Sequence, residues 1–91
     1  MYTIAIFDVK FKTNKEKIEN ILRHFGLRKI QTNTYIGKLS NANLTSFKKE
    51  IKLAIPKKDS LLILPICDNC YSKKDTFGRR INFSENLYRV F

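Results

Sequence analysis

The sequence predicts an α+β domain with the ferredoxin-like element order β-α-β-β-α-β, in which two helices pack on one face of a four-stranded antiparallel sheet. Three observations predict it: a hydrophobic strand opens the chain, two amphipathic helical patterns follow, and a strand pair separates those two patterns. The 91 residues suit one small domain, and the hydrophobic share of 43% is typical of a globular chain. We place this domain at residues 1–71 and treat residues 72–91 as a basic C-terminal extension.

The first strand and the first helix are the clearest elements. Residues 2–8 are apolar or strand-forming until Asp8 ends the run. Thr13 and Glu16 match a capping box, in which the hydroxyl and the carboxylate each accept a hydrogen bond from a free backbone amide. Gly26 ends the helix in the position that glycine usually takes there. The apolar stripe of this helix consists of Ile18, Ile21, Leu22 and Phe25.

Two further patterns are expected in the middle of the chain. Glu19 and Arg23 lie four residues apart in the predicted helix, a spacing that favours an ion pair on its surface. Residues 27–39 then alternate as two strands do, and Thr32-Asn33 is the expected turn between them.

A second helix and a fourth strand complete the predicted domain. Ser40 is a candidate N-cap, and Pro56 ends the helix that follows it. Residues 61–66 form the last strand of the domain, in which Pro65 marks a strand end or a sheet edge. The apolar face of the helix carries Leu44, Phe47, Ile51 and Ala54.

The C-terminal extension has a different texture. It is polar and basic from Lys73 to Arg80, with Gly78 as a hinge. Residues 86–91 are expected to form a short fifth strand, which would pair with an edge of its own sheet or of a partner's sheet.

The charge of the chain is strongly basic. The net charge is +10, from 18 Lys and Arg against 8 acids. An excess of this size points to a polyanionic partner, most often a nucleic acid, and an inert basic surface is the alternative. Exposed cations neutralise phosphates without precise geometry. The richest candidates for nucleic-acid binding are Lys10, Lys12, Lys15, Lys17, Arg28, Lys29, Arg79 and Arg80.

Hydropathy argues against a membrane protein. No apolar run approaches the roughly 18 residues of a membrane helix, and the longest, residues 61–67, suits a buried strand. The start shows no basic segment ahead of a long apolar stretch, as a signal peptide would. We therefore expect a cytoplasmic protein.

The two cysteines, Cys67 and Cys70, form a C-x-x-C pair. One such pair supplies only two zinc ligands, and the single His24 falls within the predicted helix, so a zinc site within one chain lacks ligands. A thioredoxin-like motif should open a helix after a strand, whereas residues 67–72 are expected to form a turn. The favoured interpretation is a pair of reduced, partly buried thiols, and their role stays open.

Asp8 is the only acid among the first fifteen residues, and lysines follow it. The default interpretation is a salt bridge to one of these lysines. The alternative is a ligand for a hard cation such as Mg²⁺ beside phosphates, because carboxylate oxygens suit that ion.

The chain resembles the small CRISPR-associated family whose members dimerise at the centre of the spacer-acquisition complex. The resemblance spans roughly residues 1–71. Phe7 stands where the family often has Tyr, Asn14 and Lys29 stand where Arg is frequent, and Asn33 stands where Ser is frequent. The segments that carry it are Ile4-Ala-Ile-Phe-Asp8, Phe25-Gly26-Leu27, Lys29-Ile-Gln31, Tyr35-Ile-Gly37-Lys-Leu39-Ser40 and Leu64-Pro65-Ile66-Cys67-Asp68-Asn-Cys70.

The resemblance implies a function and a site. The implied function is that of a homodimeric CRISPR adaptation protein, which binds duplex DNA and scaffolds the integrase subunit for spacer acquisition in antiviral defence. The alternative is a Mg²⁺-dependent endonuclease that cuts single-stranded RNA or double-stranded DNA, and a second alternative is a toxin-like ribonuclease on the same fold. In the family, the strand-one aspartates of two subunits approach each other and share a metal. Asp8 would therefore be the metal ligand and the catalytic residue, with Mg²⁺ as the cofactor.

Overall fold

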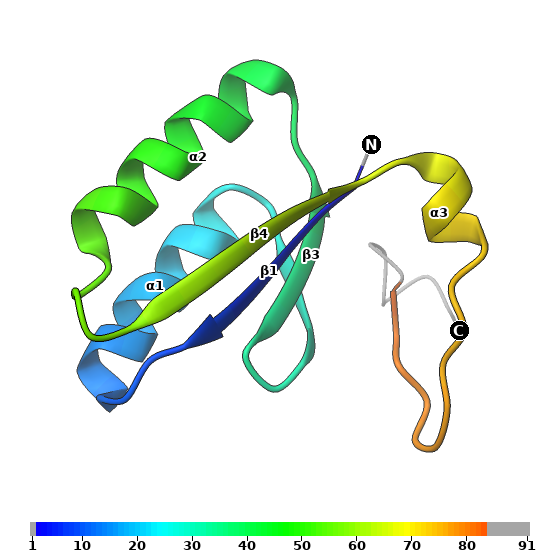
Figure 1. Ribbon diagram of the computed structural model, residues 1–91, viewed down its shortest axis with the longest axis horizontal. Helices are drawn as coiled ribbons and strands as arrows, with labels where there is room; N and C mark the ends of the chain where they lie inside the picture. Colours follow the sequence, from blue (N-terminus) through cyan, green and yellow to red (C-terminus); the bar gives the residue numbers. More distant parts are fainter. Residues whose placement is uncertain (1, 84–91) are drawn as a thin grey trace.

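The sheet carries its two long helices on one face in the computed structural model, which describes residues 2–83 (Figure 1). Along the chain the elements are β1 (Tyr2–Asp8), α1 (Lys12–His24), β2 (Arg28–Gln31), β3 (Thr34–Lys38), α2 (Asn41–Ala54), β4 (Ser60–Ile66) and α3 (Asp68–Ser72). The strand order is β2-β3-β1-β4 and every pairing is antiparallel. The predicted α+β fold with its four-stranded antiparallel sheet is confirmed. The predicted fifth strand, residues 86–91, lies outside the described residues.

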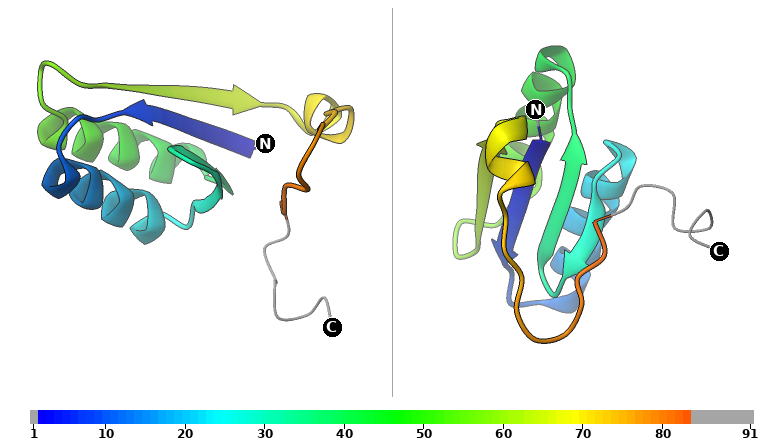
Figure 2. Two further views of the ribbon diagram at one scale, coloured as in Figure 1. Left: turned by 90° about the horizontal axis from the view of Figure 1, so that it is seen from below. Right: turned by 90° about the vertical axis from the view of Figure 1, so that its right-hand side faces the viewer.

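The core lies between the sheet and the two long helices, as the two views of Figure 2 show. Alternation along β1 sends Ala5 and Phe7 to this side, where they are 0% and 3% exposed. The apolar stripes predicted for both helices are confirmed, since α1 and α2 each bury two residues of the predicted stripe. The buried core cluster consists of Ala5, Phe7, Ile18, Leu22, Leu27, Tyr35, Phe47 and Ile51.

The C-terminal end of α1 follows the prediction. Gly26 adopts the left-handed conformation with a φ of 88°. Its N–H donates to the carbonyl of Arg23 at 2.9 Å, and the N–H of Leu27 donates to the carbonyl of Leu22 at 3.0 Å. These two bonds form a Schellman motif, which satisfies carbonyls that the helix leaves unpaired.

The capping box predicted for the N-terminal end of α1 is wrong. The helix begins at Lys12, and its N-cap is Phe11, which offers no side-chain hydrogen bond. The short link from β1 brings the chain into the helix before Thr13, so Thr13 and Glu16 already lie within its first turns. The Phe11 carbonyl instead accepts the N–H of Lys15 at 2.9 Å, as the first bond of the helix.

The predicted turn between β2 and β3 is confirmed at Thr32-Asn33. Asn33 has a φ of 59°, a left-handed conformation that asparagine tolerates better than most residues. Its carbonyl accepts the N–H of Phe7 at 3.0 Å, which ties the turn to β1.

A close backbone contact fixes β3 against the turn that follows α1. A Cβ atom placed on Gly37 would lie 2.9 Å from the carbonyl oxygen of Gly26 and 3.0 Å from the Cα of Leu27. Both neighbours are backbone atoms, which cannot swing aside, so this position requires glycine.

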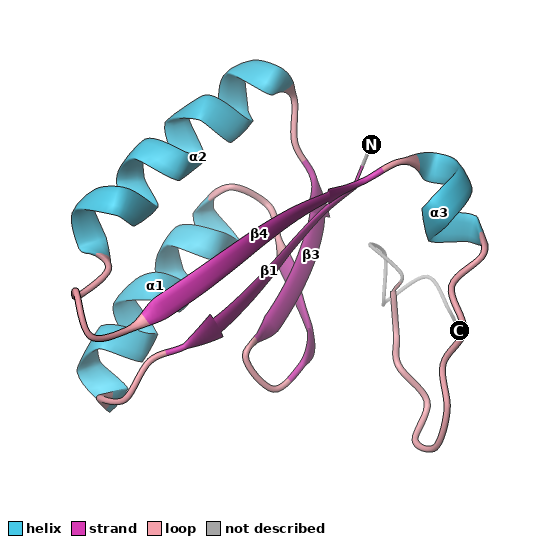
Figure 3. Cartoon of the chain, in the orientation of Figure 1, coloured by secondary structure: helices cyan, strands magenta, loops and turns pink. Residues whose placement is uncertain are grey.

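The predictions for the second half of the chain are partly confirmed and partly wrong. Ser40 caps α2, since its Oγ accepts the N–H of Asn43 at 3.1 Å. Pro65 lies in β4, which is an edge strand of the sheet. The expected turn at residues 67–72 is wrong, because Asp68–Ser72 form the short helix α3, visible after β4 in Figure 3. No helix within residues 2–83 is both long and apolar enough to span a bilayer.

Candidate nucleic-acid interface and acidic site

Asp8 lies on the open face of the sheet, which we define as the face opposite α1 and α2. It is the last residue of β1, and its partner in β4 is Ser60. The side chain is exposed, because alternation places it on the side opposite the buried Phe7. Within residues 2–83 no ion pair involves Asp8, contrary to the salt-bridge interpretation.

An apolar strip of large side chains runs beside Asp8 on this open face. It consists of Ile6, Leu62 and Leu64, which are 40%, 52% and 42% exposed. Ile6 pairs directly with Leu62 across β1 and β4, so the strip is continuous. Contiguous exposed apolar surface rimmed by polar residues marks an interaction site in soluble proteins.

The other end of the open face is covered by the chain itself. We call residues 73–83 the strap; it follows α3 and passes over this face (Figure 2). The ring of Tyr71 stacks on that of Tyr2, with centroids 3.7 Å apart. The guanidinium of Arg28 donates to the carbonyl of Phe83, and an apolar cavity of about 250 Å³ remains under the strap. Among residues 2–83, the strap thus covers the end of the open face far from Asp8, while Asp8 and the apolar strip are exposed.

Asp8 by itself is an incomplete metal site. No group of three or more His, Cys, Asp or Glu side chains gathers anywhere in residues 2–83. An exposed carboxylate without an ion-pair partner in this part of the chain suits Mg²⁺ as a donor, but it supplies one ligand only. A Mg²⁺ site at Asp8 therefore needs a second carboxylate or a phosphate from another molecule.

The predicted basic residues lie in three places, and Arg28 differs from the others. Lys10, Lys12, Lys15 and Lys17 lie in the link after β1 and in the first turns of α1, next to Asp8 in the chain. Arg79 and Arg80 are exposed on the strap, and Lys29 is exposed on β2. Arg28 is the exception, because its guanidinium holds the strap through Phe83.

The structure adds two lysines that the sequence did not single out. The backbone N–H of Lys10 donates to the carboxylate of Asp59 at 3.3 Å, which joins the link after β1 to the loop between α2 and β4. That loop carries Lys57 and Lys58, both exposed. The cations beside Asp8 thus come from two segments far apart in the chain. The only sequence signal was the run Lys57-Lys58-Asp59, and nothing in it indicates its neighbour.

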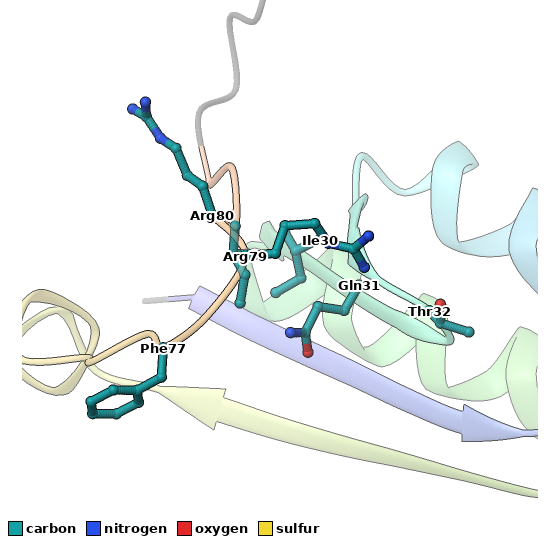
Figure 4. Close-up of a pocket in the computed structure, with 7 residues that line it drawn as sticks. Ile30, Gln31, Thr32, Phe77, Arg79 and Arg80 are labelled. Carbon is teal, nitrogen blue, oxygen red and sulfur yellow. The ribbon is translucent and has the colours of Figure 1, made fainter.

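A hollow of about 310 Å³ lies between the strap and the edge of β2 (Figure 4). In Figure 4, Arg79 extends over Ile30 toward Gln31, while Arg80 points away from the sheet. The strap thereby presents two guanidinium groups in different directions beside the strand. The residues that line the hollow are Ile30, Gln31, Thr32, Phe77, Arg79, Arg80 and Ile81.

A buried tyrosine joins the side chains that were expected to pair on α1. The hydroxyl of Tyr35 donates to the Glu19 carboxylate at 2.9 Å and accepts from the Arg23 guanidinium at 3.1 Å. Glu19 and Arg23 therefore meet at this hydroxyl, and the predicted surface ion pair between them is wrong. Burial, together with the hydrogen bond to Glu19, raises the pKa of Tyr35 to about 12. Tyr35 is thus a neutral structural phenol on the helix-covered face, away from Asp8.

The two cysteines are exposed, so the expectation of partly buried thiols is wrong. Cys67 is the N-cap of α3, and its Sγ accepts the N–H of Cys70 at 3.4 Å. Hydrogen bonds from the backbone N–H and the thiol of Cys70 lower the pKa of Cys67. The same thiol contact, and then the charge of Cys67, raise the pKa of Cys70.

Comparisons with known proteins point to one family. The model of the family described as CRISPR associated protein Cas2 matches residues 1–74. A protein of Methanospirillum hungatei named CRISPR-associated endoribonuclease Cas2 1 is 23% identical over 73 residues, which cover 79% of this chain and 77% of that protein. A protein of the same name from Archaeoglobus fulgidus is 22% identical over 73 residues, covering 79% and 78%.

Solved structures agree on the fold. A hypothetical protein from Thermus thermophilus superposes with a TM-score of 0.74 at 17% identity, covering 89% of this chain and 96% of that one. Cas2 of Streptococcus pyogenes superposes with a TM-score of 0.70 at 16% identity, covering 86% and 100%. At such identities the likeness establishes the arrangement of helices and strands.

Proposed function

Because the chain belongs to the Cas2 family of CRISPR-associated proteins, as its resemblance predicted, we propose that it is a homodimeric scaffold that binds duplex DNA for spacer acquisition. The observation that carries the proposal is the exposed apolar strip on the open sheet face, with Asp8 at its end and cations beside it. Family membership also supports the integrase subunit as the partner that this scaffold holds. Co-purification with that integrase tests this partner.

The strip matches the needs of a two-fold dimer, in which the same patch of both subunits is buried. Burying the exposed halves of Ile6, Leu62 and Leu64 in both copies would contribute about 6 kcal/mol in total. Association costs about 4–15 kcal/mol in lost rotational and translational freedom. The free energy gained by burying the strip therefore only about offsets the cost of association. We expect a stable dimer to bury part of the strap as well. Sedimentation of the full chain should give a dimer, and a monomer at about 100 μM would contradict this proposal.

We propose that the two-fold axis of this dimer passes close to Asp8, so that each Asp8 gains a second carboxylate. The two side chains then repel unless one is protonated or a cation lies between them. Mg²⁺ bound there would keep most of its waters and would polarise a phosphoryl oxygen or activate a water. The lysines beside Asp8 would hold the phosphates of a nucleic acid at the same end of the molecule.

Duplex DNA fits the remaining surface because phosphate contacts need charge rather than shape. Lys10, Lys12, Lys57 and Lys58 surround the Asp8 end, and Arg79 and Arg80 extend from the strap. Such contacts position a duplex and carry no sequence information. We therefore propose binding that depends on salt and is independent of base sequence.

A matched pair of charge reversals tests the DNA interface. Lys10→Glu with Lys12→Glu changes the Asp8 end, whereas Lys48→Glu with Lys49→Glu makes the same change on α2. At about 150 mM salt, where charges more than about 8 Å apart are screened, the first pair should weaken duplex binding at least about tenfold. Its salt slope should fall by about two, since each lost phosphate contact removes about 0.9. Equal losses in both variants would show that net charge alone drives binding.

Endonuclease activity is the second candidate function, favoured by the exposed carboxylate of Asp8 and by the endoribonuclease names of the two curated relatives. Cleavage of single-stranded RNA or duplex DNA should need Mg²⁺, stop in EDTA and stop in Asp8→Ala. Duplex binding by that variant should remain. Cleavage that survives in Asp8→Ala would remove Asp8 from the catalytic role, and loss of binding in the same variant would indicate a structural role instead.

A further inference from the structure

The C-x-x-C pair lies outside the surface proposed for DNA and metal. Cys67 follows β4 and Cys70 lies in α3, at the end of the sheet where Tyr2 pairs with Ile66. Asp8 lies at the other end of the same strands, where it pairs with Ser60. The 91 residues contain two cysteines, and both belong to this pair.

The local geometry brings the two thiols within reach of each other. The Sγ of Cys67 already accepts the backbone N–H of Cys70 at 3.4 Å, so the first sulfur lies over the residue that carries the second. Residues three apart on a helical turn have Cβ atoms about 5–6 Å apart. A disulfide needs Cβ atoms about 3.5–4.5 Å apart, which a small closure of this exposed turn provides. Both side chains are open to a reagent in solvent.

We propose that Cys67 and Cys70 form a redox-active dithiol that reduces low-molecular-weight disulfides such as oxidised glutathione, with Cys67 as the attacking thiol and Cys70 as the resolving thiol. The Cys67 thiolate bonds to one sulfur of the glutathione disulfide, and one glutathione leaves as a thiolate that takes up a proton. The Cys70 thiolate then attacks the Cys67 sulfur, and the second glutathione leaves in the same way. The protein gives up two electrons and two protons, and one disulfide becomes two thiols.

The division of roles follows from the hydrogen bonds. Cys67 receives the Cys70 backbone N–H and the Cys70 thiol, and both favour its thiolate, whereas Cys70 donates to a neighbour and is held as the thiol. α3 has five residues, so these local donors, rather than a helix dipole, are the cause. The thiolate is the attacking species in disulfide exchange, which makes Cys67 the first to react.

Oxidation would also fix the link between the sheet and the strap. α3 buries none of its residues, and Tyr71, next to Cys70, holds it to the sheet by stacking on Tyr2. A bond from Cys67 to Cys70 closes this turn covalently. The disulfide form should therefore open less often at Lys73 and Lys74, the first residues of the strap.

The test uses the full chain in mixtures of reduced and oxidised glutathione, quenched with acid, alkylated and weighed by mass spectrometry. The wild type should convert to an internal disulfide, lighter by two hydrogens and free of glutathione. Cys70→Ser should accumulate a single glutathione adduct on Cys67. Cys67→Ser should react at least about threefold more slowly, because the backbone N–H of Cys70 that favours the Cys67 thiolate does not serve the remaining thiol. Both replaced side chains are exposed, so circular dichroism should show unchanged folding in each variant.

Three results would overturn the proposal. They are equal rates in Cys67→Ser and Cys70→Ser, a stable glutathione adduct in place of the internal disulfide in the wild type, and a disulfide that forms between chains. Limited trypsin digestion gives a second readout, in which the oxidised wild type should be cut after Lys73 and Lys74 more slowly than the reduced form. Equal rates of cleavage in the two forms would show that the disulfide does not stabilise the strap. None of these outcomes depends on DNA binding or on Asp8.

Discussion

The two faces of the sheet are made from the same strands, but one face forms the core and the other is the proposed interaction surface. In β1, Ala5 and Phe7 are 0% and 3% exposed under the helices, while Ile6 between them is 40% exposed on the open face. The apolar side chains of the covered face are buried in the core, whereas those of the strip on the open face are partly exposed. Because strand residues alternate between faces, one run of hydrophobic residues can serve folding on one side and association on the other.

The largest expected effect comes from cutting the same amount of side chain from each face. Leu22→Ala removes a residue that is 0% exposed in the core and should lower the free energy of unfolding by about 3 kcal/mol. Leu62→Ala removes one that is 52% exposed and should cost under about 1 kcal/mol in the monomer. Urea denaturation at low protein concentration measures both. Similar losses would mean that the open face is part of the core.

A charge placed on the strip should separate association from folding. Leu62→Lys puts an ammonium into the proposed dimer contact and should weaken the dimer about a hundredfold, while the unfolding of the monomer changes little. Sedimentation over a range of concentrations gives the dissociation constant. Lys52→Leu offers a control, because it alters an exposed site on α2 and should leave the dimer unchanged. A dimer that tolerates Leu62→Lys must use another surface.

The buried hydroxyl of the covered face should give a smaller and pH-dependent effect. Tyr35→Phe loses the hydrogen bonds to Glu19 and Arg23 and should cost about 1 kcal/mol near neutral pH. The pKa of Tyr35 is raised from 10.0 to about 12 by folding, so the stabilisation is complete below pH 10 and is lost as the pH rises toward 12. Thermal melts from pH 9 to 12 should therefore converge for the two proteins. Parallel curves would contradict the contribution of this hydroxyl.

The smallest expected effect concerns the exposed carboxylate of Asp8 on the open face. Asp8→Asn keeps the shape and removes the charge, so in EDTA it should tighten the dimer several-fold by relieving repulsion. Added Mg²⁺ should tighten the wild type and leave the variant unchanged. Asp59→Asn provides a matched control on the neighbouring loop. If Asp8→Asn has no effect with or without Mg²⁺, the two Asp8 side chains do not meet.

Local chemistry explains which elements were predictable. Gly26 and Ser40 end and begin helices through bonds to their immediate neighbours, so the sequence around them is sufficient. Thr13 and Glu16 satisfied the same kind of local rule, and the connection from β1 overrode it. The helical turn at Cys67 was missed because five residues carry too little periodicity to distinguish a short helix from a turn.

The site was predictable only where it is continuous in the chain. Asp8 and the lysines after it are adjacent in the sequence, so their shared location follows directly. Lys57 and Lys58 reach the same place through the hydrogen bond between Asp59 and Lys10, a contact across 49 positions that no local pattern encodes. Likewise, Arg28 was expected to bind phosphate. Its guanidinium instead donates to the carbonyl of Phe83, 55 positions later, and holds the strap.

The contact between Gly37 and the backbone of Gly26 has a consequence for the pairing of the strands. If β3 slid by one residue along β1, Ile36 or Lys38 would stand where even one extra carbon atom has no room. The same slip would turn Tyr35 outward and bring a surface residue into the core. The residue with no side chain thus locks β3 against the backbone that follows α1, and a single missing carbon atom keeps the Tyr35 ring in the core.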